Sequence, residues 1–417
     1  MGKHSPVVIA PAYMESFQCI GSNCEETCCK GWTITIDKQT YKKYRTIEIR
    51  ELRDKIKTSV VLTEDASNAD NYAKIKLEED GSCSFLDDKK LCSIQGKLGA
   101  SYLSKTCHIY PRTLTRKNDE ISLYASLSCP EVARKALLDV EAMRMTHITL
   151  PYPNENAVPL STSMRYSENY PDLLVALSSY IVDTSSFVLR FPAYRSAEAM
   201  IVLGLMVQKL SQFLNAPDAE SAKNAIIERL IQFTDPHFLT QAGEFAQGIT
   251  IDRSKQIILL RGVLRIYFSK HQPHSSFKQV MLDMVAGIQF DDSDIEATEK
   301  RYFEADSKWF KPFDEAHPHL LKNYLLNDLG KNNFPIGKMR GLETEFIDLA
   351  VRYSLIKMIL VGIAAFKKEN FSEQDYVTVI YTFSRNIEHN LKFMPELLEL
   401  LAEDGLSNIA AATLMMR

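Results

Sequence analysis

The sequence carries the segment Cys19-Ile-Gly-Ser-Asn-Cys24-Glu-Glu-Thr-Cys28-Cys29-Lys-Gly-Trp32 near its N-terminus, with four thiols in eleven residues. All eight cysteines lie in the first 129 residues, and the other four follow at wider spacing. Thiols this close together cannot all be ordinary core residues, so they are ligands, disulfide partners or redox groups. The remaining four are Cys83, Cys92, Cys107 and Cys129.

The expected compartment favours ligands over disulfides. The N-terminus has no apolar run typical of a secretory signal. The longest apolar helical run, Met358 to Phe366, is far short of the roughly 20 residues that a membrane span needs. We therefore expect a soluble cytoplasmic protein without a membrane span, whose thiols stay reduced and bind a metal or an iron–sulfur cluster.

The spacing of the thiols distinguishes among metal sites. It reads C-x4-C-x3-C-C and then C-x8-C-x14-C, unlike the paired C-x2-C knuckles of a zinc ribbon. Iron–sulfur ligation is favoured, because thiolates are the usual cluster ligands, while a structural zinc stays open. Only one of two adjacent cysteines easily faces a given cluster, and Cys19 and Cys129 either take part or simply pack. The predicted ligands are Cys24, Cys28, Cys29, Cys83, Cys92 and Cys107.

Length and composition indicate a globular protein of two or three domains. The chain has 417 residues, 45% of them hydrophobic and 24% charged, with a net charge of −4. No basic excess or polybasic patch is present, so we expect no nucleic-acid partner.

The predicted fold is mainly α, with a small cysteine-rich α+β domain followed by an all-helical domain. The first covers residues 1–150, Pro151 to Asn156 is a linker, and the second covers 156–417. Alternation or β-branched residues predict strands at Thr33–Asp37, Val60–Leu62, Tyr72–Leu77 and Ile121–Leu127.

Helical periodicity and capping residues predict the helices. Thr344–Lys368 is expected to be the strongest amphipathic helix. In the first domain we expect helices after Asp37, at Gly96–Leu103 and at Pro130–Met145. In the second we expect them at Pro171–Val182, Arg195–Leu214, Ala219–Phe233, Lys255–Lys270, Phe277–Ile288, Asp294–Phe310, His319–Gly330, Thr344–Lys368, Ser372–Phe393 and Pro395–Ala402.

Few other residues point to chemistry. Arg112, near Cys107 and His108, is suited either to binding a carboxylate with both guanidinium nitrogens or to a structural ion pair. His317 and His319 have the spacing of a ligand pair, but two histidines alone do not make a metal site. The glycines form no nucleotide-binding motif.

The cysteine motifs resemble a known family. The elements Phe17-x-Cys19-x-Gly21-Ser-x-Cys24-x3-Cys28-Cys29-x-Gly31-Trp32, Cys83-x-Phe-Leu-Asp, Leu91-Cys92 and Cys107-x2-Tyr110-Pro111-Arg112 are similar to those of flagellin lysine-N-methylases of the FliB type. The same cysteine core resembles small zinc- or iron-chelating proteins of the YkgJ type. The helical remainder fits in length and in the segment Asn323-Tyr324-Leu325-Leu326-Asn327.

The resemblance implies methyl transfer from S-adenosylmethionine to the ε-amino group of flagellin lysines, and an iron–sulfur cluster of the cubane 4Fe-4S type. A further hypothesis places S-adenosylmethionine beside a catalytic cluster, between the two domains, with Arg112 on its carboxylate. Polar and radical transfer both stay open. The alternative is a non-catalytic metal-binding adaptor that docks flagellin or another protein.

Overall fold

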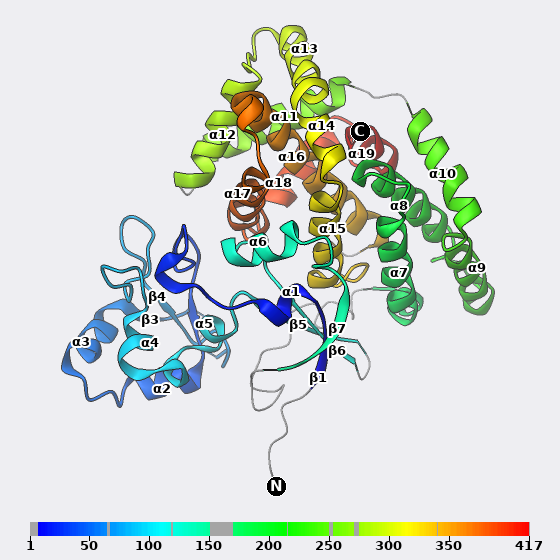
Figure 1. Ribbon diagram of the computed structural model, residues 1–417. Coiled ribbons are helices and arrows are strands. Elements are labelled where there is room, and N and C mark those ends of the chain that lie inside the picture. The colour runs from blue at the N-terminus through cyan, green and yellow to red at the C-terminus, as the bar shows by residue number, and fades with distance from the viewer. Residues whose placement is uncertain are drawn as a thin grey trace.

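The computed structural model describes residues 7–64, 67–117, 120–150, 170–214, 216–249, 253–270, 275–339 and 341–416. It confirms the predicted fold class, because a small α+β region precedes a large assembly of helices (Figure 1). The predicted linker Pro151 to Asn156 lies outside the described residues. We call residues 18–110 the thiol lobe and the rest of the described chain the helical body.

The thiol lobe is built on a three-stranded antiparallel sheet. Its strands are β2 (Thr35–Ile36), β3 (Val60–Leu62) and β4 (Ala73–Ile75), in the order β2-β4-β3. All three fall within the predicted strands. The lobe's helices are α2 (Lys38–Tyr44), α3 (Arg50–Ser59), α4 (Ser93–Leu98) and α5 (Lys105–Ile109).

Asp37 joins two of these helices. Its carboxylate accepts hydrogen bonds from the backbone N–H of Thr40, at the start of α2, and from that of Lys105, at the start of α5. The predicted helix Gly96–Leu103 is instead two short helices, because Gly99 has a φ of +84° and ends α4.

A second sheet belongs to the helical body, and its strands β1 and β5 lie on either side of the thiol lobe in the sequence. Its order is β5-β6-β1-β7, and β1 runs parallel to β6 and antiparallel to β7. Leu114, Leu123 and Ala125 turn inward and join the large core of the body. The strands are β1 (Val7–Pro11), β5 (Arg112–Lys117), β6 (Glu120–Ala125) and β7 (Met145–Thr149).

One prediction in this region was wrong. The helix expected over Pro130–Met145 is α6 (Pro130–Leu138), and Met145 begins β7. The segment Met145-Thr-His-Ile-Thr149 contains three β-branched residues, which favour a strand, and it pairs with β1 from Val7 to Pro11. A short helix, α1 (Tyr13–Ser16), follows β1.

The described residues after 170 are helical, as predicted. Most boundaries differ by a few residues, but α7 extends to Arg190 instead of Val182, and the helix predicted over Ser372–Phe393 ends at Phe383 and continues as a π segment to Glu388. Pro312 lies in the first turn of α14, a position where proline is common. Helices α10, α14 and α19 were not predicted. The helices are α7 (Asp172–Arg190), α8 (Ser196–Ser211), α9 (Ala219–Gln232), α10 (Pro236–Gly248), α11 (Arg253–Lys270), α12 (Ser275–Gly287), α13 (Ile295–Ala305), α14 (Lys311–Ala316), α15 (His319–Lys331), α16 (Leu342–Lys367), α17 (Glu373–Phe383), α18 (Phe393–Glu403) and α19 (Ile409–Met416).

Two π-helical segments interrupt this series. They are η6 (Asp306–Phe310), between α13 and α14, and η8 (Ser384–Glu388), after α17. Such wide turns often occur at functional sites.

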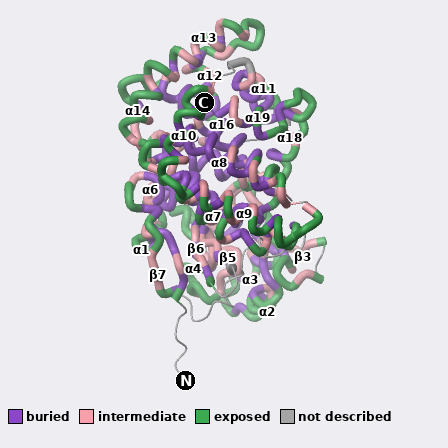
Figure 2. The backbone as a smooth tube through the Cα atoms, turned by 90° about the vertical axis from the view of Figure 1, so that its right-hand side faces the viewer, coloured by how far each residue is buried: buried purple, intermediate pink, exposed green. Residues whose placement is uncertain are grey.

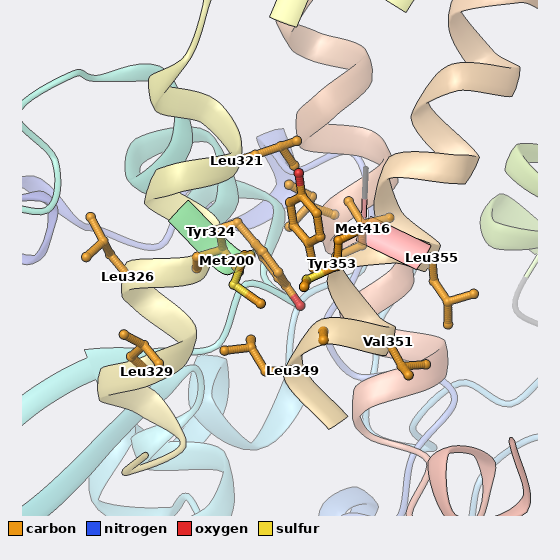
Figure 3. Close-up of a cluster of buried hydrophobic side chains, with 14 of the residues drawn as sticks. Met200, Leu321, Tyr324, Leu326, Leu329, Leu349, Val351, Tyr353, Leu355 and Met416 are labelled. Carbon is orange, nitrogen blue, oxygen red and sulfur yellow. The ribbon is translucent and has the colours of Figure 1, made fainter. Parts of the chain in front are cut away.

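Helix α16 is central rather than amphipathic, which corrects the prediction for Thr344–Lys368. Nineteen of its residues are buried, and they lie all around the helix. Figure 3 draws its side chains in one cluster with residues of α8, α15 and α19, including Met200, Tyr324 and Met416. Helices α7 and α16 are long and apolar enough to cross a membrane. However, 83% of the apolar 18-residue stretch of α16 is buried inside the protein, as in a core helix.

The buried residues form two separate clusters. One comprises twelve residues of the thiol lobe, and the other extends from Val8 in β1 to Met416 in α19 (Figure 2). Residues 7–17 and 112–150 therefore share the core of the helical body. The predicted division into domains at residue 150 stays a prediction.

Candidate functional site

Four predicted ligands lie around the small core of the thiol lobe. Cys83 is buried there, and Cys29, Cys92 and Cys107 pack against it. The backbone N–H of Cys83 donates to the carbonyl of Cys29 at 2.8 Å. Cys92 precedes α4 and Cys107 lies on α5, so the sheet and the short helices bring three distant segments together.

The electrostatics of these thiols reflect their burial and their proximity. Burial raises the pKa of Cys83 to about 11 and that of Cys107 to about 12, and neighbouring thiols add to both shifts. The adjacent sulfurs of Cys28 and Cys29 are 3.9 Å apart. Their hydrogen bond lowers the pKa of Cys28 to about 7 and raises that of Cys29. Of the two, Cys28 is the thiol that ionises more readily.

The other cysteines lie outside this small core. Cys19 is exposed, and Cys24 is partly buried beside Glu25. Cys129 precedes α6 and packs against the core of the helical body, and burial raises its pKa to about 12. The charges of Cys24 and Cys28 also raise the pKa of Cys129.

The thiols do not form a site for a single metal ion. Among the described residues, no three His, Cys, Asp or Glu side chains converge closely enough to hold one ion. The sulfurs around one zinc ion all lie about 2.3 Å from it, whereas the thiolates around a cubane bind several different irons and lie farther apart. The absence of a single-ion site therefore does not test the predicted cluster ligands, which stay a prediction.

Arg385 of η8 connects the thiol-bearing loop to the helical body. Its guanidinium donates to Glu26 Oε2 at 2.5 Å, to the carbonyl of Thr27 at 3.3 Å and to that of Ser128 at 3.2 Å. The side chains of Arg385 and Glu26 are 6% and 12% exposed, so solvent hardly screens this pair. The loop that bears Cys24 and Cys28 is thereby fixed against the body.

A polar cluster around the buried Ser128 continues this contact. His389 Nε2 lies 2.9 Å from Ser128 Oγ, and Tyr110 Oη lies 3.0 Å from the same hydroxyl. Trp32 stacks on Tyr110 with ring centroids 5.7 Å apart, and its indole N–H donates to the carbonyl of Cys28. Burial lowers the pKa of His389 to about 4, so it is neutral near pH 7.

The remaining candidates have structural surroundings. The Arg112 guanidinium lies over the ring of Phe17, 5.0 Å from its centroid. The rings of His317 and His319 are 6.4 Å apart, and His317 Nδ1 lies 2.9 Å from the carbonyl of Phe313. Within the described residues, neither histidine belongs to a group that could hold a metal ion.

A pocket of about 120 Å³ lies in the helical body. Three elements line it: the first turn of α8, the segment η6–α14 and the middle of α16. Its lining residues are Arg195, Ser196, Ala197, Glu198, Asp306, Phe310, Lys311, Asp314, Tyr353 and Lys357.

The helical part of the chain is similar to a known family. Residues 183–415, more than half of the chain, match the FliB lysine N-methylase C-terminal domain. The chain belongs to the FliB lysine N-methylase family.

Relatives of known name extend the FliB similarity beyond that domain. The chain is 25% identical over 413 residues to a lysine-N-methylase of Salmonella choleraesuis, covering 92% of each chain. It is 24% identical to a lysine-N-methylase of Salmonella typhimurium, with the same coverage. It is 39% identical over 139 residues to the flagellar biosynthetic protein FliU of Salmonella muenchen, covering 33% of this chain and 81% of the relative. No solved structure matches.

Membership in the FliB family confirms the resemblance and the predicted enzyme class, a protein-lysine N-methyltransferase. Sequence reasoning missed Arg385 and the charged residues of the pocket. A usable signal was present at Lys357, a lone charge in the apolar run Leu355-Ile-Lys-Met-Ile359. Asp306 and Asp314 are eight residues apart, about two helical turns, and share a face.

Proposed function

We propose that this protein transfers the methyl group of S-adenosylmethionine to the ε-amino group of flagellin lysines in the cytoplasm, and that its thiol lobe carries an iron–sulfur cluster. The carrying observation is the FliB match over residues 183–415, together with similarity to two lysine-N-methylases over nearly the full chain. The flagellar name of a third relative supports a flagellar protein as substrate.

The donor set of the thiol lobe fits a cluster. Four thiols surround one small core, and their mutual influence on pKa indicates proximity. The residues that would hold the cluster are Cys29, Cys83, Cys92 and Cys107, with Cys28 as the alternative to Cys29. A bound cluster would cross-link the segments of this small lobe. It would also supply iron that can change its oxidation state.

Methyl transfer by the polar route needs a neutral lysine amine. The nitrogen lone pair attacks the methyl carbon, the carbon–sulfur bond breaks, and its electron pair leaves with the sulfur as S-adenosylhomocysteine. The nitrogen then loses a proton. A desolvated pocket favours this reaction, because burial lowers the pKa of the amine.

The test is methylation of flagellin by the purified full chain. The protein is isolated anaerobically, its iron and sulfide are measured, and it is incubated with flagellin and methyl-labelled S-adenosylmethionine. We expect label on lysine ε-amino groups by mass spectrometry. Flagellin binding without label would instead support the adaptor alternative.

A separate test addresses the cluster. We expect iron chelation to increase amide hydrogen exchange in α2, α3 and α5 while leaving α16 unchanged, because the lobe has the smaller core. Absence of iron and sulfide after anaerobic isolation contradicts the cluster.

A further inference from the structure

We propose that the pocket between α8, η6–α14 and α16 binds the amino-acid end of the methyl donor, holding its carboxylate at the start of α8 and its ammonium between Asp306 and Asp314. This inference rests on the proposed use of S-adenosylmethionine. It places the donor's amino-acid end in the helical body, in a pocket that no thiol lines.

The carboxylate side of the pocket is the N-terminus of a sixteen-residue helix. Ser196 and Ala197 are the first residues of α8 and line the pocket. The first N–H groups of an α-helix have no acceptor within the helix, and the helix dipole places positive charge there. Lys357 on α16 adds a half-buried ammonium and, in the part of the chain that the structure describes, forms no ion pair. Glu198, the third residue of α8, accepts a hydrogen bond from the backbone N–H of Arg195 at 3.1 Å, and the Arg195 guanidinium pairs with it at 2.7 Å. With Glu198 paired in this way, the N–H groups of Ser196 and Ala197 and the Lys357 ammonium favour an added anion.

The ammonium side of the pocket carries two carboxylates. Asp306 Oδ1 is buried and has no hydrogen-bond partner among the described residues, which indicates an acceptor left for a ligand. Asp314 accepts a hydrogen bond from Tyr376 Oη at 3.1 Å on one oxygen. Burial raises the pKa of Asp314 to about 6, so it is largely ionised near pH 7.

The π segment produces this arrangement. Asp306 and Phe310 begin and end η6, and Asp314 follows on α14, so all three face the pocket. Phe310 and Tyr353 give the pocket an apolar wall.

Charge and volume distinguish the amino-acid end from other ligands. A lysine side chain of a protein substrate brings only an ammonium. The zwitterionic end also brings a carboxylate, which the start of α8 and Lys357 can attract in addition to the nearby carboxylates of Glu198 and Asp314. A volume of about 120 Å³ is below the roughly 300 Å³ of pockets that enclose whole drug-sized ligands. The pocket therefore fits the zwitterionic end, with the adenosine outside.

The test compares two ligands that differ in this end. S-adenosylhomocysteine carries the amino acid, and 5′-methylthioadenosine lacks it. Their affinities are measured by calorimetry on the full chain and on the variants Asp306→Asn, Asp314→Asn and Lys357→Met. Glu304→Gln and Lys300→Met, exposed on α13, are matched controls outside the pocket.

We expect the wild type to prefer S-adenosylhomocysteine. Each pocket variant should weaken its binding by about tenfold or more, as for loss of a charge-assisted hydrogen bond, and leave methylthioadenosine within about twofold. The controls should change neither affinity. Circular dichroism melting identifies any pocket variant that fails to fold. The affinities of the remaining pocket variants then test the inference.

Three outcomes overturn the inference. Equal affinity of the wild type for both ligands, or unchanged binding in all folded pocket variants, contradicts it while the proposed function stands. If the pocket variants lose binding of n-butylamine but keep that of S-adenosylhomocysteine, the pocket takes the substrate lysine instead. If the wild type binds no S-adenosylhomocysteine, the proposed donor fails and this inference fails with it.

Discussion

The thiol lobe has twelve buried residues in its core, whereas the core of the helical body includes residues from strand β1 to helix α19. The lobe supplements its small core with polar ties such as Asp37, which links α2 to α5. The body instead buries a charged network around Arg352. Small cores commonly depend on metals or other cross-links for stability. We therefore expect the thiol lobe to unfold when such a cross-link is lost, and the helical body to unfold when its buried charges lose their partners.

The largest expected effect is in the body. Arg352 is 7% exposed and pairs with Asp328 at 2.6 Å and with Asp348 at 2.8 Å. Arg352→Ala leaves both carboxylates buried without their cation, and we expect a loss of about 3–5 kcal/mol in the free energy of unfolding. Urea denaturation measures it. Lys97→Met, which breaks an exposed pair with Glu51 in the lobe, is the control and should leave the midpoint unchanged.

A buried carboxyl group predicts a pH effect in the body. Burial raises the pKa of Glu345 from 4.5 to about 7, while hydrogen bonds from Tyr170 and Met339 oppose the shift. The folded protein then binds a proton more tightly than the unfolded chain, so stability falls as pH rises from about 4.5 to 7. The full shift corresponds to about 3 kcal/mol.

The variant Glu345→Gln isolates this contribution. Unfolding is measured at several values between pH 4 and pH 8. We expect the variant to lose less stability than the wild type over this range, although Asp314 titrates in both proteins. If the stability of the variant and that of the wild type change equally with pH, the pKa of Glu345 is not raised.

The contact between the regions predicts a coupling. Arg385→Met, Glu26→Gln and the double variant form a double-mutant cycle, and we expect a coupling of about 1.5–3 kcal/mol for this buried, charge-assisted pair. Hydrogen exchange of the Cys24–Trp32 segment gives the readout. The exposed pair Lys30–Asp80, within the lobe, should show no measurable coupling. Additive single effects at Arg385 and Glu26 would show that the regions dock by other contacts.

The smallest of these effects is in the lobe. Asp37→Ala removes acceptors for the first turns of α2 and α5, and we expect a loss of about 1–2 kcal/mol, as for other helix caps. Hydrogen exchange should increase in both helices. The exposed cap Asp218 of α9 gives a matched substitution with a smaller effect, because it serves one helix. Faster exchange in α2 alone would refute the double role of Asp37.

Local patterns predicted much of the fold. Val60–Leu62 was predicted to the residue, and the bounds of α16 were predicted to within two residues, although as an amphipathic helix. The alternation of Met145–Thr149 becomes decisive only when β1 lies beside it, more than 130 residues earlier in the chain. Pairing between distant strands is a tertiary fact, and helical periodicity alone could not supply it.

Some residues of the candidate site could likewise be predicted from local sequence patterns, and others could not. The thiols were identified from spacing, since cysteines that lie close in sequence stand out from any other pattern. Arg385 was missed because its role depends on Glu26, which is distant in sequence. Asp306 was missed because the pocket that it lines is formed by three elements that are distant in sequence. The chain leaves the body after Phe17 and returns at Arg112, and these two side chains touch.

The contact between Phe17 and Arg112 also bears on how such proteins evolve. The thiol lobe is attached to the rest of the chain by two adjacent points, as a domain inserted into a loop would be. An ancestor could therefore have gained it in a single insertion without disturbing the order β5-β6-β1-β7. A lobe attached in this way can be shared, as a cysteine pattern, by proteins that have no helical body, so the pattern alone does not identify a reaction.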